Sequence, residues 1–158
     1  MPTKKWDLAA MYQSYGTVII FIALLALASI FTRNFATMAN MTNVVRQMVV
    51  VTLLAFGVTF VIILGHIDVS LGSVIALTGC IACMVQQATD NIWLSVAAGV
   101  ATGMVVGIAN GYIVTWFTIP AFIMTLAMTT VARGAVLLIT GGRPITKLGD
   151  FRIIGQGN

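Results

Sequence analysis

The sequence predicts an all-α, polytopic transmembrane protein with about five spans. Of its 158 residues, 59% are hydrophobic and 8% are charged, and glutamate is absent. A soluble domain carries about three times this charged fraction, which it needs to cover its surface. Apolar runs separated by short polar segments follow one another along the chain. Lipid is therefore the solvent that suits this chain, and helix is the default backbone there because every N–H and C=O must be bonded internally.

Residues 1–15 form an amphiphilic lead in which basic and aromatic side chains precede the first apolar run. Lys4 and Lys5 stand beside Trp6, a combination typical of a cytoplasmic membrane interface. The first span is expected at about 16–31. An A-x-A-like pattern within it leaves a cleaved signal peptide as the alternative, but the apolar runs that follow favour a first span.

The second and third spans are expected at about 47–64 and 74–87. Between them, residues 65–73 (GHIDVSLGS) interrupt the apolar pattern with two glycines, a histidine, an aspartate and two serines. Helices that break at membrane depth are tolerated where they line a protein-buried or water-filled cavity. We therefore predict a broken or re-entrant segment near 65–73. The residues assigned to the helix break are Gly65, His66 and Gly72.

The fourth span, expected at about 92–116, has the clearest periodicity in the chain. It carries a glycine at every fourth position, a repeated G-x-x-x-G pattern that lets another helix approach closely. The residues assigned to helix packing are Gly99, Gly103, Gly107 and Gly111. The fifth span is expected at about 120–140, with a proline in its first turn. Residues 141–158 form a polar tail.

An acidic residue inside a membrane domain marks a candidate functional site because it is expensive to bury in lipid. Asp68 is therefore a candidate for contact with a substrate, although with Ser70 and Ser73 it is also suited to cap the next helix. Arg133 either snorkels to the interface or pairs with Asp68. Asn110 is expected to hydrogen-bond across helices or to line a polar pathway.

Covalent chemistry and metal binding have little support. The chain has one histidine, no Ser–His–Asp arrangement with an orienting partner and no G-x-x-x-x-G-K-[ST] phosphate loop. Cys80 and Cys83 share one face of an apolar helix without further ligands nearby, which favours packing over redox or zinc chemistry. The few basic residues are scattered, so nucleic-acid binding is not expected.

Several ordered motifs resemble the permease subunits of bacterial ATP-binding-cassette importers for monosaccharides, the ribose/xylose/galactose branch. Residues 59–73 (TFVIILGHIDVSLGS) are similar to that family's T-x-V-I-x-x-G-G-I-D-L-S-V-G-S, with His66 in place of a usual glycine. The other similar motifs are NGYIV at 110–114, IPAFIMTL at 119–126, ARG at 132–134 and TGGRPI at 140–145. Family members are considerably longer, so the sequence looks like the N-terminal half of such a permease.

The resemblance implies a membrane-spanning component of an ATP-driven importer of ribose-like monosaccharides, located as a multi-pass protein in the bacterial inner membrane. The implied partners are a second permease subunit, an ABC ATPase subunit that carries the ATP, an extracytoplasmic sugar-binding protein and the lipid bilayer. No cofactor is expected in this chain itself. Sugar hydroxyls need hydrogen-bonding groups along their path, and the candidates are Asp68, Ser70, Ser73, Asn110, Thr125, Thr129 and Arg133.

Two alternatives to an intact transport subunit stay open. One is a truncated or split permease fragment that inserts in the membrane but does not transport alone. The other, a small membrane enzyme, lacks any catalytic constellation. The orientation is also open: with Lys4 and Lys5 inside, five crossings place the tail outside, whereas a re-entrant hairpin around Asp68 places it in the cytoplasm.

Overall fold

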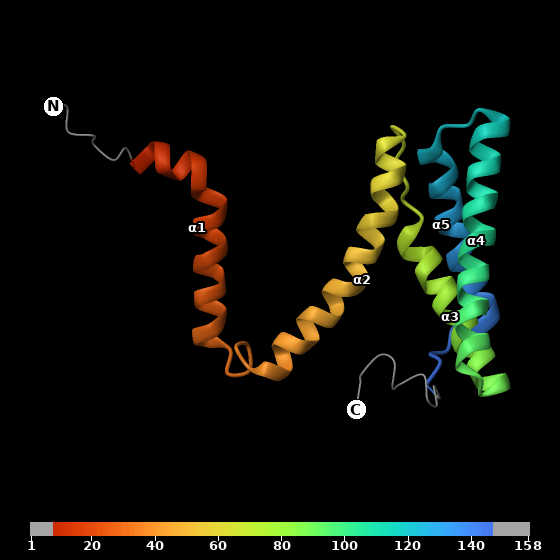
Figure 1. The fold of residues 1–158 in the computed structure, drawn as a ribbon, viewed down its shortest axis with the longest axis horizontal. Helices are drawn as coiled ribbons and strands as arrows, with labels where there is room; N and C mark the ends of the chain where they lie inside the picture. Colours follow the sequence, from red (N-terminus) through yellow and green to blue (C-terminus); the bar gives the residue numbers. More distant parts are fainter. Residues whose placement is uncertain (1–7, 147–158) are drawn as a thin grey trace. The chain divides into compact units, whose positions relative to one another are not determined.

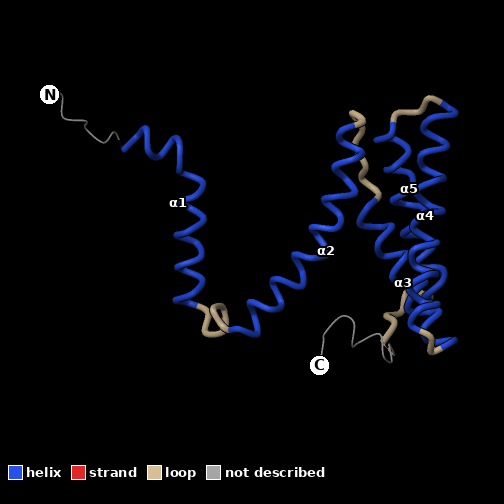
Figure 2. Tube along the Cα trace, viewed as in Figure 1, coloured by secondary structure: helices blue, strands red, loops and turns tan. Residues whose placement is uncertain are grey.

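The computed structural model describes residues 8–146, with side chains from residue 15 onward. All regular structure in this part of the chain is helical (Figures 1 and 2). The helices are α1 (Leu8–Phe31), α2 (Met38–Ile63), α3 (Leu71–Thr89), α4 (Ile92–Phe117) and α5 (Ala121–Thr140). The predicted all-α fold is confirmed. Residues 1–7 of the predicted lead, including Lys4 and Lys5, and the tail beyond residue 146 lie outside the described residues.

Four helices, α2 to α5, are long and apolar enough to cross a membrane. The described apolar part of α1, Tyr15–Phe31, is shorter. α4 has 26 residues and is therefore about 39 Å long, enough to cross a hydrocarbon core of about 30 Å with some tilt. The helices thus account for the predicted multi-span character of the chain.

Three helices begin earlier than the predicted spans, and the first of them, α1, begins at Leu8 rather than near 16. α2 begins at Met38 rather than near 47, because the hydroxyl of Thr37 accepts a hydrogen bond from the N–H of Asn40 at 3.3 Å and so caps the helix. α3 begins at Leu71 rather than near 74. Gly72 consequently lies in the first turn of α3, and its assignment to the helix break is wrong.

The chain divides into two compact units, Met1–Leu53 and Leu54–Asn158. The first unit holds α1 and the beginning of α2. In the second unit α3 packs against α4 and α5, which also contact each other (Figure 1). The buried apolar residues of the described chain are all small: Cys80, Ala82 and Ala132. Small side chains allow the close helix contacts that are typical of membrane proteins.

A buried polar cluster closes the turn between α3 and α4. Gln86, which is 2% exposed, accepts a hydrogen bond from the hydroxyl of Ser95 at 3.0 Å and donates one to Asp90 at 3.1 Å. Asn91 caps α4 by accepting the N–H groups of Trp93 and Leu94 at 3.1 and 3.2 Å. These hydrogen bonds therefore connect the end of α3 to the start of α4.

Candidate functional site

Gly65 ends α2 in a left-handed turn. Its φ is +75°, which a glycine adopts without strain. The N–H of Gly65 bonds to the carbonyl of Ile62 at 2.9 Å, and the N–H of His66 bonds to that of Val61 at 3.0 Å. This pair of bonds satisfies the last carbonyls of the helix and releases the chain from it. We call residues 64–70, which connect α2 to α3, the break segment.

Asp68 organises the start of α3 from within the break segment. Its Oδ1 accepts two hydrogen bonds from Ser70, one from the N–H and one from the hydroxyl, both at 2.7 Å. Hydrogen bonds to a carboxylate are shorter and stronger than neutral ones. The carbonyl of Ser70 in turn accepts the hydroxyl of Ser73 at 2.7 Å. The Ser70 side chain makes no cap bond itself, so the carboxylate two residues upstream fixes the entry to the helix.

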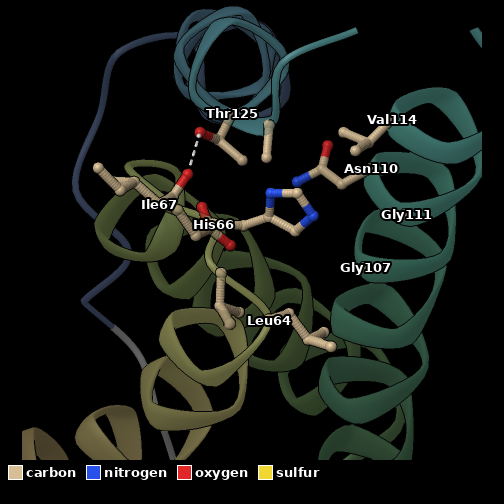
Figure 3. Close-up of a pocket in the computed structure, with 11 residues that line it drawn as sticks. Leu64, His66, Ile67, Gly107, Asn110, Gly111, Val114 and Thr125 are labelled. Carbon is tan, nitrogen blue, oxygen red and sulfur yellow. Dashed lines mark hydrogen bonds between the residues drawn. The ribbon is translucent and has the colours of Figure 1, made fainter. Parts of the chain in front are cut away.

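Two threonines of α5 hold the backbone of the break segment. The hydroxyl oxygen of Thr125 accepts the N–H of Val69 at 3.2 Å and lies 3.5 Å from the carbonyl oxygen of Ile67 (Figure 3). One turn further along α5, the hydroxyl of Thr129 lies 3.3 Å from the carbonyl oxygen of Val69. A non-helical backbone lacks internal partners, and these hydroxyls replace them.

The break segment lies inside the length of the helices, not at their ends. Thr125 and Thr129 are about 6 and 12 Å along the axis from Ala121, where α5 begins. Asn110, which also contacts the segment, is about 10 Å from the end of α4. Irregular backbone at such a depth occurs where it is buried in protein or borders a cavity.

Asn110 of α4 makes the third connection to the break segment. Its Nδ2 donates to the hydroxyl oxygen of Ser70 at 3.4 Å. The proton of that hydroxyl is already donated to Asp68, so the Ser70 oxygen can only accept, and the Asn110 amide must present its nitrogen to it. Asn110 is 9% exposed, and its Oδ1 has no hydrogen-bond partner among the described residues.

These groups border a cavity of about 260 Å³ between the break segment, α4 and α5 (Figure 3). Its polar lining consists of His66, Asp68, Asn110 and Thr125, and no lysine or arginine of the described residues lines it. In Figure 3 the imidazole of His66 projects from the break segment and lies beside the amide of Asn110. The remaining lining residues are apolar or glycine: Val61, Leu64, Ile67, Gly107, Gly111, Val114 and Ala121.

The structure gathers most of the candidate residues around one segment. Asp68, Asn110 and Thr125 line the cavity. Ser73 and Thr129 are outside its lining but contact the backbone of the break segment. Their contact with a substrate stays a prediction, whereas their structural contacts are direct.

Arg133 stands apart from this group. It is exposed on α5, does not line the cavity and makes no ion pair or hydrogen bond within the described residues. The predicted alternative of an intramembrane pair with Asp68 is therefore wrong. Thr129, one turn earlier on α5, still reaches the break segment, so Arg133 lies one turn too far along the helix and faces outward.

The glycine stripe of α4 serves two purposes. A Cβ added to Gly99 would lie 3.3 Å from the Cβ of Ala82, so α3 and α4 approach closely here, as predicted. Gly103 is in similarly close contact with α3. Gly107 and Gly111, by contrast, have open space beside them and line the cavity. Assigning all four glycines to packing was thus wrong for the second pair, because their spacing is the same in both environments.

A multi-span helical chain, whose non-helical segment is held by side chains of two helices beside a largely apolar cavity with a few polar groups, has an architecture found in membrane transport proteins. Comparison with known proteins identifies the family of the chain. Residues 40–150 match the family described as "Branched-chain amino acid transport system / permease component", and the chain belongs to this family.

Curated relatives from several bacteria carry names of sugar transport proteins. The chain is 36% identical over 143 residues to "Ribose import permease protein RbsC" of Escherichia coli (strain K12), which covers 90% of this chain and 43% of the relative. It is 36% identical over 158 residues to the protein of the same name from Bacillus subtilis (strain 168), covering 98% and 49%. It is 31% identical over 144 residues to "L-arabinose transport system permease protein AraH" of E. coli (strain K12), covering 91% and 44%.

The chain thus spans somewhat less than half the length of the curated relatives it matches. Their names describe transport proteins, not enzymes. No solved structure matches the chain significantly.

Proposed function

We propose that this chain is the membrane-spanning permease component of an ATP-driven monosaccharide importer in a bacterial inner membrane, where it forms part of the sugar pathway. The observation that carries the proposal is the break segment. Its backbone leaves the helical conformation inside the length of the helices, and side chains of α4 and α5 hold it beside a cavity. Discontinuous helices of this kind form substrate sites in many transporters.

The chemistry of the cavity favours a sugar over an amino acid. A branched-chain amino acid carries a carboxylate, which a site usually binds with a cationic side chain or with free backbone N–H groups. The cavity offers Asp68 and Asn110 as oxygen acceptors, and within residues 8–146 no lysine or arginine lines it. A neutral molecule with several hydroxyl groups matches acceptors of this kind, and the names of the relatives from E. coli and B. subtilis refer to ribose and L-arabinose.

The remaining components follow from the transport class. The relatives named for ribose are import permeases, and the sequence contains no phosphate-binding loop. We therefore assign ATP binding and hydrolysis to a partner ATPase, and delivery of the sugar to an extracytoplasmic binding protein. A second permease subunit would complete the membrane part.

Uptake measurements test the proposed function. The complete gene product is expressed with the products of neighbouring reading frames in a host without its own pentose transporters, and labelled ribose, arabinose, hexoses and leucine are offered. We expect ATP-dependent uptake of a monosaccharide and none of leucine. Uptake of leucine without any sugar would contradict the proposal. Uptake only after a separately encoded C-terminal half is supplied would show a split permease.

A further inference from the structure

Asn110, which lines the cavity, carries a hydrogen-bond acceptor that the described part of the chain leaves unused. The Oδ1 of Asn110 is buried without a hydrogen-bond partner in the described chain, although nearly all buried polar groups in proteins have one. The amide cannot simply be turned over, because Ser70 donates its only hydroxyl proton to Asp68 and requires the Asn110 nitrogen as donor. Asp68 and Ser70 of the break segment therefore fix the orientation of the Asn110 amide on α4, and with it the position of Oδ1.

A second acceptor faces the same space. Asp68 uses Oδ1 for both bonds from Ser70, and its Oδ2 has no hydrogen bond among the described residues. Asp68 and Asn110 both line the cavity. Two oxygens that can only accept call for a ligand that donates, and a hydroxyl group is the neutral donor that also tolerates the apolar remainder of the lining.

We propose that the cavity between the break segment, α4 and α5 is a binding site for a neutral polyhydroxylated ligand, in which Asn110 Oδ1 accepts one specific ligand hydroxyl. The proposal rests on the proposed function. It adds the binding site and the atom, Asn110 Oδ1, that discriminates between ligands with and without that hydroxyl. A volume of about 260 Å³ equals the liquid volume of roughly nine water molecules, which suits a monosaccharide ring with its hydroxyl groups. The carboxylate of Asp68 disfavours anionic ligands such as sugar phosphates.

His66 controls access to the discriminating atom. Asn110 Oδ1 is shielded from solvent in the structure, so a ligand hydroxyl reaches it only after a neighbouring side chain moves. The ring of His66 lies beside the Asn110 amide, is exposed and makes no hydrogen bond within the described part of the chain (Figure 3). Rotation of the His66 ring breaks no hydrogen bond within the described residues, and side-chain rotations of this kind are common on binding.

The test combines variants with substrate analogues in the uptake assay. Each hydroxyl of the transported sugar is replaced in turn by hydrogen, and initial uptake rates are measured for the wild type and for Asn110→Ala at equal protein levels in the membrane. One deoxy analogue should be taken up about three- to tenfold less efficiently than the parent by the wild type. Asn110→Ala should lose a similar factor with the parent sugar and nothing further with that analogue.

Two further variants separate binding from structure. Thr129→Val removes a hydroxyl that contacts the backbone of the break segment but leaves Asn110, Ser70 and Asp68 in place, so it should lower uptake of every analogue by one common factor. Thr115→Ala alters an exposed hydroxyl on the same helix as Asn110 that bonds to its own turn, and it should change nothing. If Asn110→Ala does not accumulate in the membrane, Asn110→Ser is used instead.

The outcomes distinguish the site from the function. Uniform losses across all analogues in the Asn110 variant, or a wild type that does not discriminate among deoxy analogues, overturn the site while leaving sugar transport intact. A wild type that transports no monosaccharide rejects the proposed function and the site with it.

Discussion

The hydroxyl oxygen of Thr125 accepts the backbone N–H of Val69 at 3.2 Å, across 56 positions of sequence. Thr125 is 4% exposed, so no water is available to replace it. The bond fixes the break segment to α5 at the depth of the cavity. The position of the cavity wall therefore depends on side chains of a helix that follows much later in the chain.

Replacing Thr125 with valine keeps the shape of the side chain and removes the acceptor. The N–H of Val69 is then left unpaired, and we expect the free energy of unfolding in lipid or detergent to fall by about 1–3 kcal/mol. Thr130→Val is the matched control, because Thr130 is exposed on the same helix and bonds only to its own turn. Equal losses of stability in both variants would contradict this role of Thr125.

A double-mutant cycle tests whether Asp68 interacts with Ser70 or with Arg133. Asp68→Ala removes the acceptor and Ser70→Ala the donor of the hydrogen bond between the Ser70 hydroxyl and Asp68 Oδ1, so their effects on stability should be non-additive by about 0.5–3 kcal/mol. Asp68→Ala and Arg133→Ala should be additive within about 0.5 kcal/mol, since the structure keeps these residues apart. A large coupling energy between Asp68 and Arg133 would instead support an ion pair between these two residues.

Gly65→Ala and Gly57→Ala should change stability in opposite directions. Gly65 has a φ of +75°, where an alanine is strained by about 1–2 kcal/mol. Gly57 lies within α2 with nothing within 4 Å of an added Cβ, so alanine there should stabilise by about 0.5–1 kcal/mol. Thermal unfolding of both variants checks the prediction, and stabilisation by Gly65→Ala would refute the left-handed turn.

Valine substitutions along α4 separate the two roles of its glycine stripe. Gly99→Val forces extra methyl groups against Ala82, and we expect a loss of about 1–3 kcal/mol in stability. Gly107→Val projects into the cavity instead, so stability should be retained while sugar uptake falls. Retained stability in Gly99→Val, or normal uptake in Gly107→Val, would show that the stripe is not divided in this way.

The fold class and the location of the site could be predicted because both leave strong local patterns. Apolar runs long enough to cross lipid have few soluble alternatives, and residues 65–73 concentrate glycine and polar side chains where an uninterrupted helix would be apolar. Asp68 stands out by its charge alone. Asn110 and Thr125 were noted for their polarity, but their shared orientation toward the break segment depends on how α4 and α5 pack.

The errors arose where one local pattern fits two environments. Glycines at every fourth position look the same whether they face a helix or a cavity, and Gly107 differs from Gly99 only in what lies opposite. Gly72 resembles a helix breaker in sequence, yet the hydrogen bonds that Ser70 donates to Asp68 fix the start of the helix before it. The separation of Arg133 from Asp68 depends on how far along the axis of α5 the break segment lies, which the sequence does not specify.

The buried apolar residues of the described chain are small, and most of its large apolar side chains are exposed. Separating α3 from α4 and α5 within a bilayer would therefore exchange protein neighbours for lipid tails and bring little apolar surface into contact with water. The heat-capacity change of such a separation should be small, because hydration of apolar surface is its main source. The stability of this helical unit should accordingly vary little with temperature through that term, and it should respond more strongly to the thickness and composition of the surrounding bilayer.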